Sequence, residues 1–145
     1  MNNFTNSDGA QLQAEGLALA YDRQRIIQDL DLQLPAGKIS VIIGPNGCGK
    51  STLLRALAGL LKPQTGQILL DGRALARFGA RELAKRLGLL PQSSSAPAGI
   101  SVADLVARGR FPHQGLLRQW SAEDAAAVSE ALRLTDLTAL AERPV

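Results

Sequence analysis

The sequence predicts an α/β fold in which a small antiparallel sheet, a glycine-rich loop and several helices follow one another along the chain. Two segments with alternating apolar residues lie near the N-terminus, a β-branched run leads into the glycine-rich loop, and the pattern becomes wholly helical near residue 96. The 145 residues suffice for one domain with a sizeable core. A hydrophobic fraction of 46% with only 3% aromatic residues makes that core aliphatic.

The first two strands are expected to pair. Residues Leu12 to Tyr21 alternate loosely, and Ile26 to Leu34 alternate better, with leucines on one face and polar residues on the other. We expect a half-buried strand antiparallel to the first, joined to it by a turn at Asp22-Arg23. Residues 1–10 are rich in Asn, Ser, Asp and Gly, and we expect them to be disordered.

The next strand, Ile39 to Ile43, is short, nearly all apolar and β-branched, which is typical of a fully buried parallel strand. A glycine-rich loop follows, and then leucines at helical spacing predict a helix from Lys50 to Leu61. Strand, glycine-rich loop and helix in this order form the context of a phosphate-binding P-loop.

Beyond this helix the elements become shorter. Ile68 to Leu70 is expected to be a strand that ends in a tight turn at Asp71-Gly72. We expect a short helix from Arg81 to Arg86, a buried strand from Leu87 to Leu90, and a loop over residues 93–99.

The C-terminal part is predicted to be helical. Ser101 and Ser121 are each followed three residues later by an aspartate, the pattern of a capping box. The helices are expected over 102–108 and 122–134, and a third begins near Leu137.

The glycine-rich loop carries the candidate binding residues, which are Gly44, Pro45, Asn46, Gly47, Cys48, Gly49, Lys50, Ser51 and Thr52. Its successive backbone N–H groups and the positive end of the following helix suit a triphosphate. Gly47 and Gly49 allow a close approach that a Cβ would block. Lys50 is expected to reach the outer phosphates, and the Ser51 hydroxyl to ligate Mg²⁺ with Thr52 beside it. The expected cofactors are therefore ATP and Mg²⁺.

Cys48 lies inside this loop and is the one cysteine of the chain, so no intrachain disulfide can form. Two interpretations remain open: a reactive thiolate near a helix N-terminus, or a small residue that the loop tolerates.

Charge and hydropathy limit the partners. The net charge is +3, and the basic residues are scattered, with Arg81, Lys85 and Arg86 beside Glu82 as on a solvated helix face. Nucleic acid is not expected as a partner. No signal peptide is evident, and no apolar run approaches the roughly 18 residues of a membrane span. We expect any membrane association to go through a partner protein.

The loop resembles the Walker A motif of ABC-transporter ATPases, whose start has the same Gly-Pro-Asn-Gly pattern. The resemblance implies that Tyr21 is the aromatic A-loop residue that stacks on adenine. It also implies that Gln92, in Leu90-Pro91-Gln92, is the Q-loop residue that contacts Mg²⁺ and the attacking water. Lys50 and Gln92 are thus the residues expected to take part in catalysis.

The segment Val102 to Gly115 looks like the region after the Q-loop in ATPases of iron–siderophore, haem and vitamin B12 importers. The resemblance implies ATP-driven uptake of an iron chelate, on the cytoplasmic face of the membrane. The implied partners are a membrane permease whose coupling helix contacts residues 93–120, a second ATPase subunit, and indirectly a binding protein. Arg108, Arg110 and His113 are candidate permease contacts, and a solvated basic turn is an equal alternative.

The resemblance divides the chain into a P-loop core with an antiparallel β edge over 11–95 and the start of a helical subdomain over 96–145. The family's signature motif, Walker B and switch histidine do not occur in this sequence, which therefore looks truncated. The alternatives to an importer subunit are a nucleotide-binding fragment that does not hydrolyse ATP, and an ABC-type ATPase outside transport.

Overall fold

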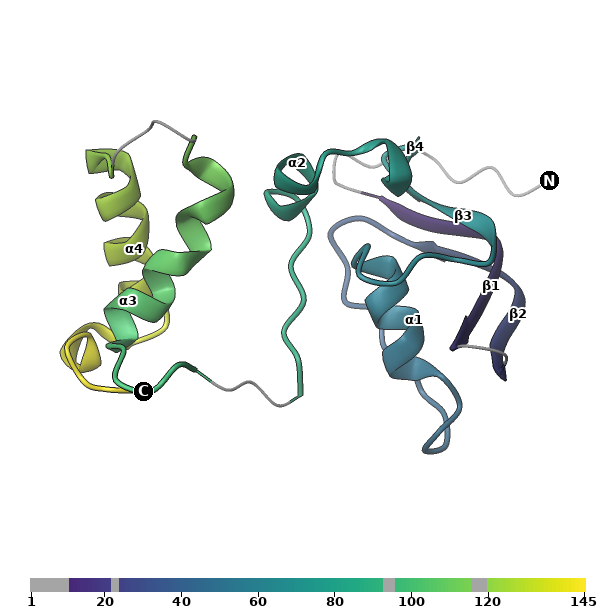
Figure 1. The fold of residues 1–145 in the computed structure, drawn as a ribbon, viewed down its shortest axis with the longest axis horizontal. Coiled ribbons are helices and arrows are strands. Elements are labelled where there is room, and N and C mark those ends of the chain that lie inside the picture. The colour runs from purple at the N-terminus through teal and green to yellow at the C-terminus, as the bar shows by residue number, and fades with distance from the viewer. Residues whose placement is uncertain (1–10, 22–23, 93–95, 116–119) are drawn as a thin grey trace. The chain divides into compact units, whose positions relative to one another are not determined.

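A computed structural model describes residues 11–21, 24–92, 96–115 and 120–145. The chain divides into two compact units, Met1–Leu89 and Leu90–Val145, each of which is described by itself (Figure 1). The expected disorder of residues 1–10 and the turn at Asp22-Arg23 lie outside the described residues.

The first unit contains an antiparallel sheet in the order β2-β1-β3-β4. Its strands are β1 (Leu12–Tyr21), β2 (Gln24–Leu34), β3 (Thr65–Leu70) and β4 (Arg73–Ala74). β1 pairs with β2 on one side and with β3 on the other. This pairing confirms the predicted antiparallel pair of N-terminal strands. The alternating leucines of β2 are partly buried and pack against the core.

Helix α1 (Lys50–Leu57) packs against this sheet and forms the core with it (Figure 1). The buried members of this core are Ala14, Leu17, Leu19, Leu53, Ala56, Leu57, Ile68, Leu70 and Leu75. The helix is shorter than predicted because Gly59, with φ +74°, reverses the chain. The Gly59 N–H donates to Ala56 O (2.9 Å) and the Leu60 N–H to Arg55 O (2.8 Å), a Schellman cap that ends the helix.

After β3 the chain turns as predicted. Asp71 and Gly72 have φ of +51° and +74° and join β3 to β4 in a tight hairpin. A 3₁₀ turn, η1 (Leu75–Arg77), and the short helix α2 (Ala80–Ala84) follow. The predicted helix is therefore present but ends earlier than Arg86.

The predictions of a buried parallel strand from Ile39 to Ile43 and of a buried strand from Leu87 to Leu90 are wrong. Residues 39–43 and 87–90 have no regular secondary structure and pair with no strand in the described part of the chain. Most of their apolar side chains are exposed, with Ile39 at 95%, Ile43 at 89% and Leu90 at 91%, whereas Ile42 and Leu87 are partly buried against the core. A parallel strand becomes buried only between neighbouring strands, and no described residue supplies such neighbours.

The second unit is helical, with α3 (Val102–Ala107), η2 (Arg108–His113), α4 (Ala122–Leu134) and η3 (Thr138–Leu140). Both predicted capping boxes are confirmed: the serine hydroxyl accepts from the backbone N–H of the aspartate, which bonds back to the serine N–H. The end of the chain returns to the start of α3, where Val102 N–H donates to Arg143 O at 2.9 Å.

Candidate phosphate-binding site

The loop from Gly44 to Gly49 lies on the surface between residues 39–43 and α1. Gly47 has φ +81° and Gly49 has φ +98°, both in the left-handed region that favours glycine. Across the tip of the loop, the Cys48 N–H donates to Pro45 O at 3.4 Å. The sequence therefore forms a compact turn with its backbone exposed to solvent.

Gly49 is the N-cap residue of α1, and no side chain caps the helix there. The N–H groups of the first helical turn lack intrahelical acceptors, and the helix dipole places a partial positive charge at this end. A Cβ on Gly49 would lie 2.6 Å from Ile26 Cγ2 on β2. Glycine is thus required where the loop enters the helix, both by the backbone angle and by the contact with β2.

The side chain of Lys50 curls back over the loop. Its ammonium group donates to Gly44 O at 2.8 Å and to Pro45 O at 2.7 Å. These bonds hold the positive charge beside the exposed backbone rather than away from it. Ser51 is exposed at the same end of α1, whereas the Thr52 side chain is buried in the packed face of the helix. Thr52 could therefore contribute only its backbone N–H to a ligand at the loop.

A triphosphate fits this set of groups. The uncapped helix N-terminus, the glycines without Cβ atoms and the ammonium of Lys50 supply N–H and charged donors to one anionic ligand. The exposed hydroxyl of Ser51 is an oxygen ligand of the kind that Mg²⁺ takes together with phosphate oxygens. No cluster of three His, Cys, Asp or Glu that could hold a metal occurs among the residues described.

Cys48 is exposed, with its Sγ 3.8 Å from Lys50 Nζ. A Cβ on Gly44 would lie 2.8 Å from that Sγ, so the thiol fills the space beside a glycine at the base of the loop. We therefore expect a larger group on the thiol to lie close to Gly44 and Lys50.

Family resemblance assigned Tyr21 and Gln92 to the same site as this loop, but the described part of the structure does not establish this placement for either residue. Tyr21 ends β1 opposite Gln24, and its ring lies outside the described part of the structure. Gln92 lies on an exposed bend in the second unit, which is described separately from the loop. Both assignments remain predictions.

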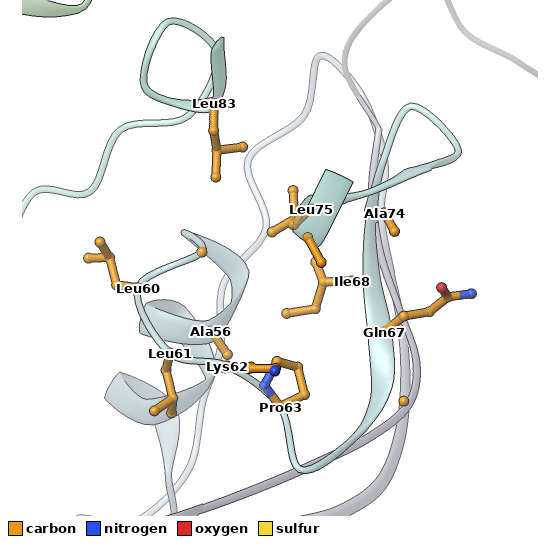
Figure 2. Close-up of a pocket in the computed structure, with 13 residues that line it drawn as sticks. Ala56, Leu60, Leu61, Lys62, Pro63, Gln67, Ile68, Ala74, Leu75 and Leu83 are labelled. Carbon is orange, nitrogen blue, oxygen red and sulfur yellow. The ribbon is translucent and has the colours of Figure 1, made fainter. Parts of the chain in front are cut away.

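A cavity of about 590 Å³ lies elsewhere in the first unit (Figure 2). It is lined by Ala56 of α1, Leu60 just after that helix, Ile68 of β3, Leu75 of η1 and Leu83 of α2, and by none of residues 44–52. This cavity is lined mainly by apolar side chains. A phosphate site consists of exposed backbone groups, so the volume of a cavity does not identify it.

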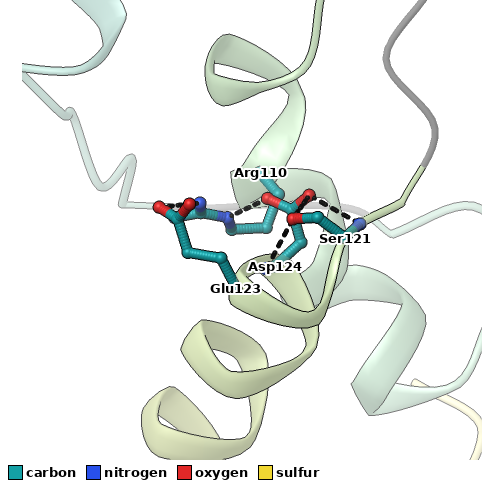
Figure 3. A network of polar contacts seen from close by, with 4 residues as sticks. All are labelled: Arg110, Ser121, Glu123 and Asp124. Carbon is teal, nitrogen blue, oxygen red and sulfur yellow. Dashed lines mark hydrogen bonds and ion pairs between the residues drawn. The ribbon is translucent and has the colours of Figure 1, made fainter.

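The second unit contains a polar cluster that the sequence did not predict (Figure 3). Arg110 Nε donates to Asp124 Oδ1 at 2.8 Å, and the Ser121 hydroxyl donates to Asp124 Oδ2 at 2.8 Å. Arg110 also lies 3.7 Å from Glu123. The Arg110 guanidinium and then the Ser121 hydroxyl lower the pKa of the Asp124 carboxyl from 3.8 to about 2.

This cluster changes the interpretation of Arg110. Its side chain is only 16% exposed, and the Asp124 side chain only 3%. Arg110 therefore joins η2 to the start of α4 and is largely buried rather than solvated. Arg108 is exposed and His113 is half-buried, so both remain candidates for a permease contact.

Comparison with known proteins identifies relatives along nearly the whole chain. The family model described as ABC transporter matches residues 27–145. The achromobactin transport ATP-binding protein CbrD of Dickeya dadantii is 53% identical over 129 residues, which cover 89% of this chain and 48% of CbrD. The ferric enterobactin transport ATP-binding protein FepC of Escherichia coli is 45% identical, covering 94% of this chain and 50% of FepC.

Solved structures agree with these relatives. A structure described as a metal-chelate type ABC transporter in an inward-facing conformation matches with a TM-score of 0.73 and 32% identity, covering 93% of this chain and 48% of that one. The predicted P-loop fold with an antiparallel β edge is confirmed by this match. The chain spans about half the length of the curated relatives it matches.

Proposed function

Because this chain belongs to the ABC transporter family, we propose that it forms the nucleotide-binding part of the ATPase subunit of an importer for an iron–siderophore or a similar chelate. The observation that carries the proposal is the exposed glycine loop at the uncapped N-terminus of α1, with Lys50 folded over it. The relatives named for achromobactin and ferric enterobactin transport support the choice of substrate class.

The residues of the loop would divide the work of holding ATP. The backbone N–H groups from Gly44 to Thr52 would bind the phosphates, and Lys50 would turn from the carbonyls of its own loop to the outer phosphates. Ser51 would hold Mg²⁺, which neutralises phosphate charge during transfer. Tyr21 would stack on the adenine, and Gln92 would complete the Mg²⁺ site and position the attacking water.

The proposed partners follow from the same family. Residues 93–120 would contact the coupling helix of a membrane permease on the cytoplasmic face, and a second ATPase subunit would complete each ATP site. A binding protein would act through the permease. No helix in the described ranges is long and apolar enough to cross a membrane.

A second candidate is a nucleotide-binding chain that does not hydrolyse ATP. The exposed apolar side chains of residues 39–43 favour it, because the described residues form no sheet that would support the loop from that side. In this case Lys50 would still bind phosphate, but no group would activate water. An ABC-type ATPase outside transport remains the third alternative.

Two measurements on the tagged protein expressed in its native cell separate these candidates. An importer subunit copurifies with a membrane permease and hydrolyses ATP at a rate that Lys50→Ala abolishes. ATP binding without hydrolysis would assign the second candidate, and hydrolysis without any permease would contradict the transport function. The variant Lys62→Ala is the matched control, since Lys62 is exposed and lies outside the loop.

A further inference from the structure

The positive charge of this chain is concentrated in one short segment. Residues 71–86 contain five basic residues and two acidic ones, a net charge of +3, which equals the net charge of the whole chain. The remainder of the sequence is therefore balanced. The segment forms one continuous part of the first unit, from the β3–β4 turn through η1 to the end of α2.

Two of the five basic side chains are already neutralised. Arg73 pairs with Glu82 at 2.6 Å, and its guanidinium lies 4.1 Å from the centre of the Phe78 ring. Arg86 pairs with Asp71 and lies 5.8 Å from the same ring. Phe78 and its two arginines thus fix η1 to α2 without contributing free charge.

The other three, Arg77, Arg81 and Lys85, form what we call the basic surface. All three are exposed, and no ion pair or hydrogen bond joins their side chains to another residue that the structure describes. Arg81 and Lys85 are one helical turn apart on α2 and its C-cap, so they share a face. These three positive charges are therefore presented to solvent within one short stretch of the chain.

We propose that the basic surface contacts the anionic phospholipid headgroups of the membrane on which the transporter acts. A diffuse, exposed set of cations without a pocket suits a polyanionic plane better than a single phosphate ligand. Nucleic acid fits less well, because the Phe78 ring is covered by Arg73 and is not available to stack on a base. The choice of a bilayer rests on the proposed transport function, whereas the existence of the basic surface does not.

Such a contact adds to anchoring by a permease and does not replace it. Each basic side chain near an anionic bilayer raises partitioning roughly fivefold, so three raise it about a hundredfold. This effect weakens as salt screens the charges. The protein would thereby be held with one face towards the membrane while a permease provides specific docking.

The test is vesicle cosedimentation without nucleotide, using phosphatidylcholine vesicles with and without phosphatidylglycerol. The combined variant R77Q/R81Q/K85Q removes the basic surface, and R25Q/K38Q/K62Q removes the same charge from exposed positions elsewhere in the first unit. We expect the unsubstituted chain to bind only vesicles with phosphatidylglycerol. The first variant should lose about a hundredfold in partitioning, and the control variant much less.

Three results would overturn the proposal: no partitioning onto phosphatidylglycerol vesicles, equal losses in the two variants, or tighter binding to double-stranded DNA than to vesicles of equal phosphate concentration. If the combined variant failed to fold by circular dichroism, Lys85→Gln alone must still lose roughly fivefold relative to Lys38→Gln. Failure of this test would leave ATP binding untouched, because no step of it uses nucleotide.

Discussion

Two glycines of the phosphate loop allow backbone strain to be separated from side-chain collision. Gly47 and Gly49 both have positive φ, but a Cβ on Gly47 would meet nothing within 4 Å, whereas a Cβ on Gly49 would lie 2.6 Å from Ile26 Cγ2. An L-residue in the left-handed region costs about 1–2 kcal/mol. Forcing apart a packed contact costs a further 1–3 kcal/mol or so.

We therefore expect Gly47→Ala to reduce the stability of the first unit by about 1–2 kcal/mol, and Gly49→Ala by about 2–5 kcal/mol. Amide hydrogen exchange in α1 measures this loss locally. The amides of α4 serve as an internal control, since α4 belongs to the second unit.

Adding Ile26→Ala to Gly49→Ala removes the atom that the new Cβ would meet, so the collision part of the cost should disappear and the strain should remain. Equal effects of Gly47→Ala and Gly49→Ala would refute the reasoning. The reasoning would also be refuted if the stability losses of Gly49→Ala and Ile26→Ala simply added in the double variant. In that case the contact with Ile26 would not restrict the size of the side chain at residue 49.

Three further predictions follow from the structure. Alkylation of Cys48 should block Mg-ATP binding in a calorimetric titration, because its Sγ lies beside Gly44 and Lys50; full affinity after complete modification would show that the loop geometry is wrong. Ser121→Ala should lower the stability of the second unit by about 1 kcal/mol through loss of the N-cap, measured by urea unfolding at Trp120, and an unchanged midpoint would contradict the cap. Because the folded pKa of Asp124 is depressed to about 2, its contribution to stability is present above pH 3.8 and is lost as the pH falls towards 2; Asp124→Asn should remove this pH dependence.

The local parts of the fold could be predicted because neighbouring residues determine them. The alternating leucines of β2, the Asp71-Gly72 turn and the two serine caps each depend on residues within a few positions of one another. The end of α1 was missed for a local reason as well. Leu60 continued the helical spacing, but Gly59 provides the Schellman cap that ends the helix and leaves Leu60 70% exposed.

The other errors concern features that depend on distant residues. Residues 39–43 have the composition of a buried strand, but a strand is buried by its neighbours, and composition does not supply them. The bond between Arg110 and Asp124 joins residues on two elements, and only the capping role of Asp124 left a signal in the sequence. The loop residues from Gly44 to Ser51 could be proposed from the sequence because the phosphate site that we propose uses consecutive backbone groups.

The central claim is that the loop from Gly44 to Thr52 binds ATP through its backbone and Lys50. Its most direct test is a calorimetric titration of Mg-ATP into the 145-residue chain, beside Lys50→Ala and the control Lys62→Ala. We predict saturable binding that Lys50→Ala abolishes and Lys62→Ala preserves. Binding retained by Lys50→Ala, or no binding by the unsubstituted chain, would contradict the claim.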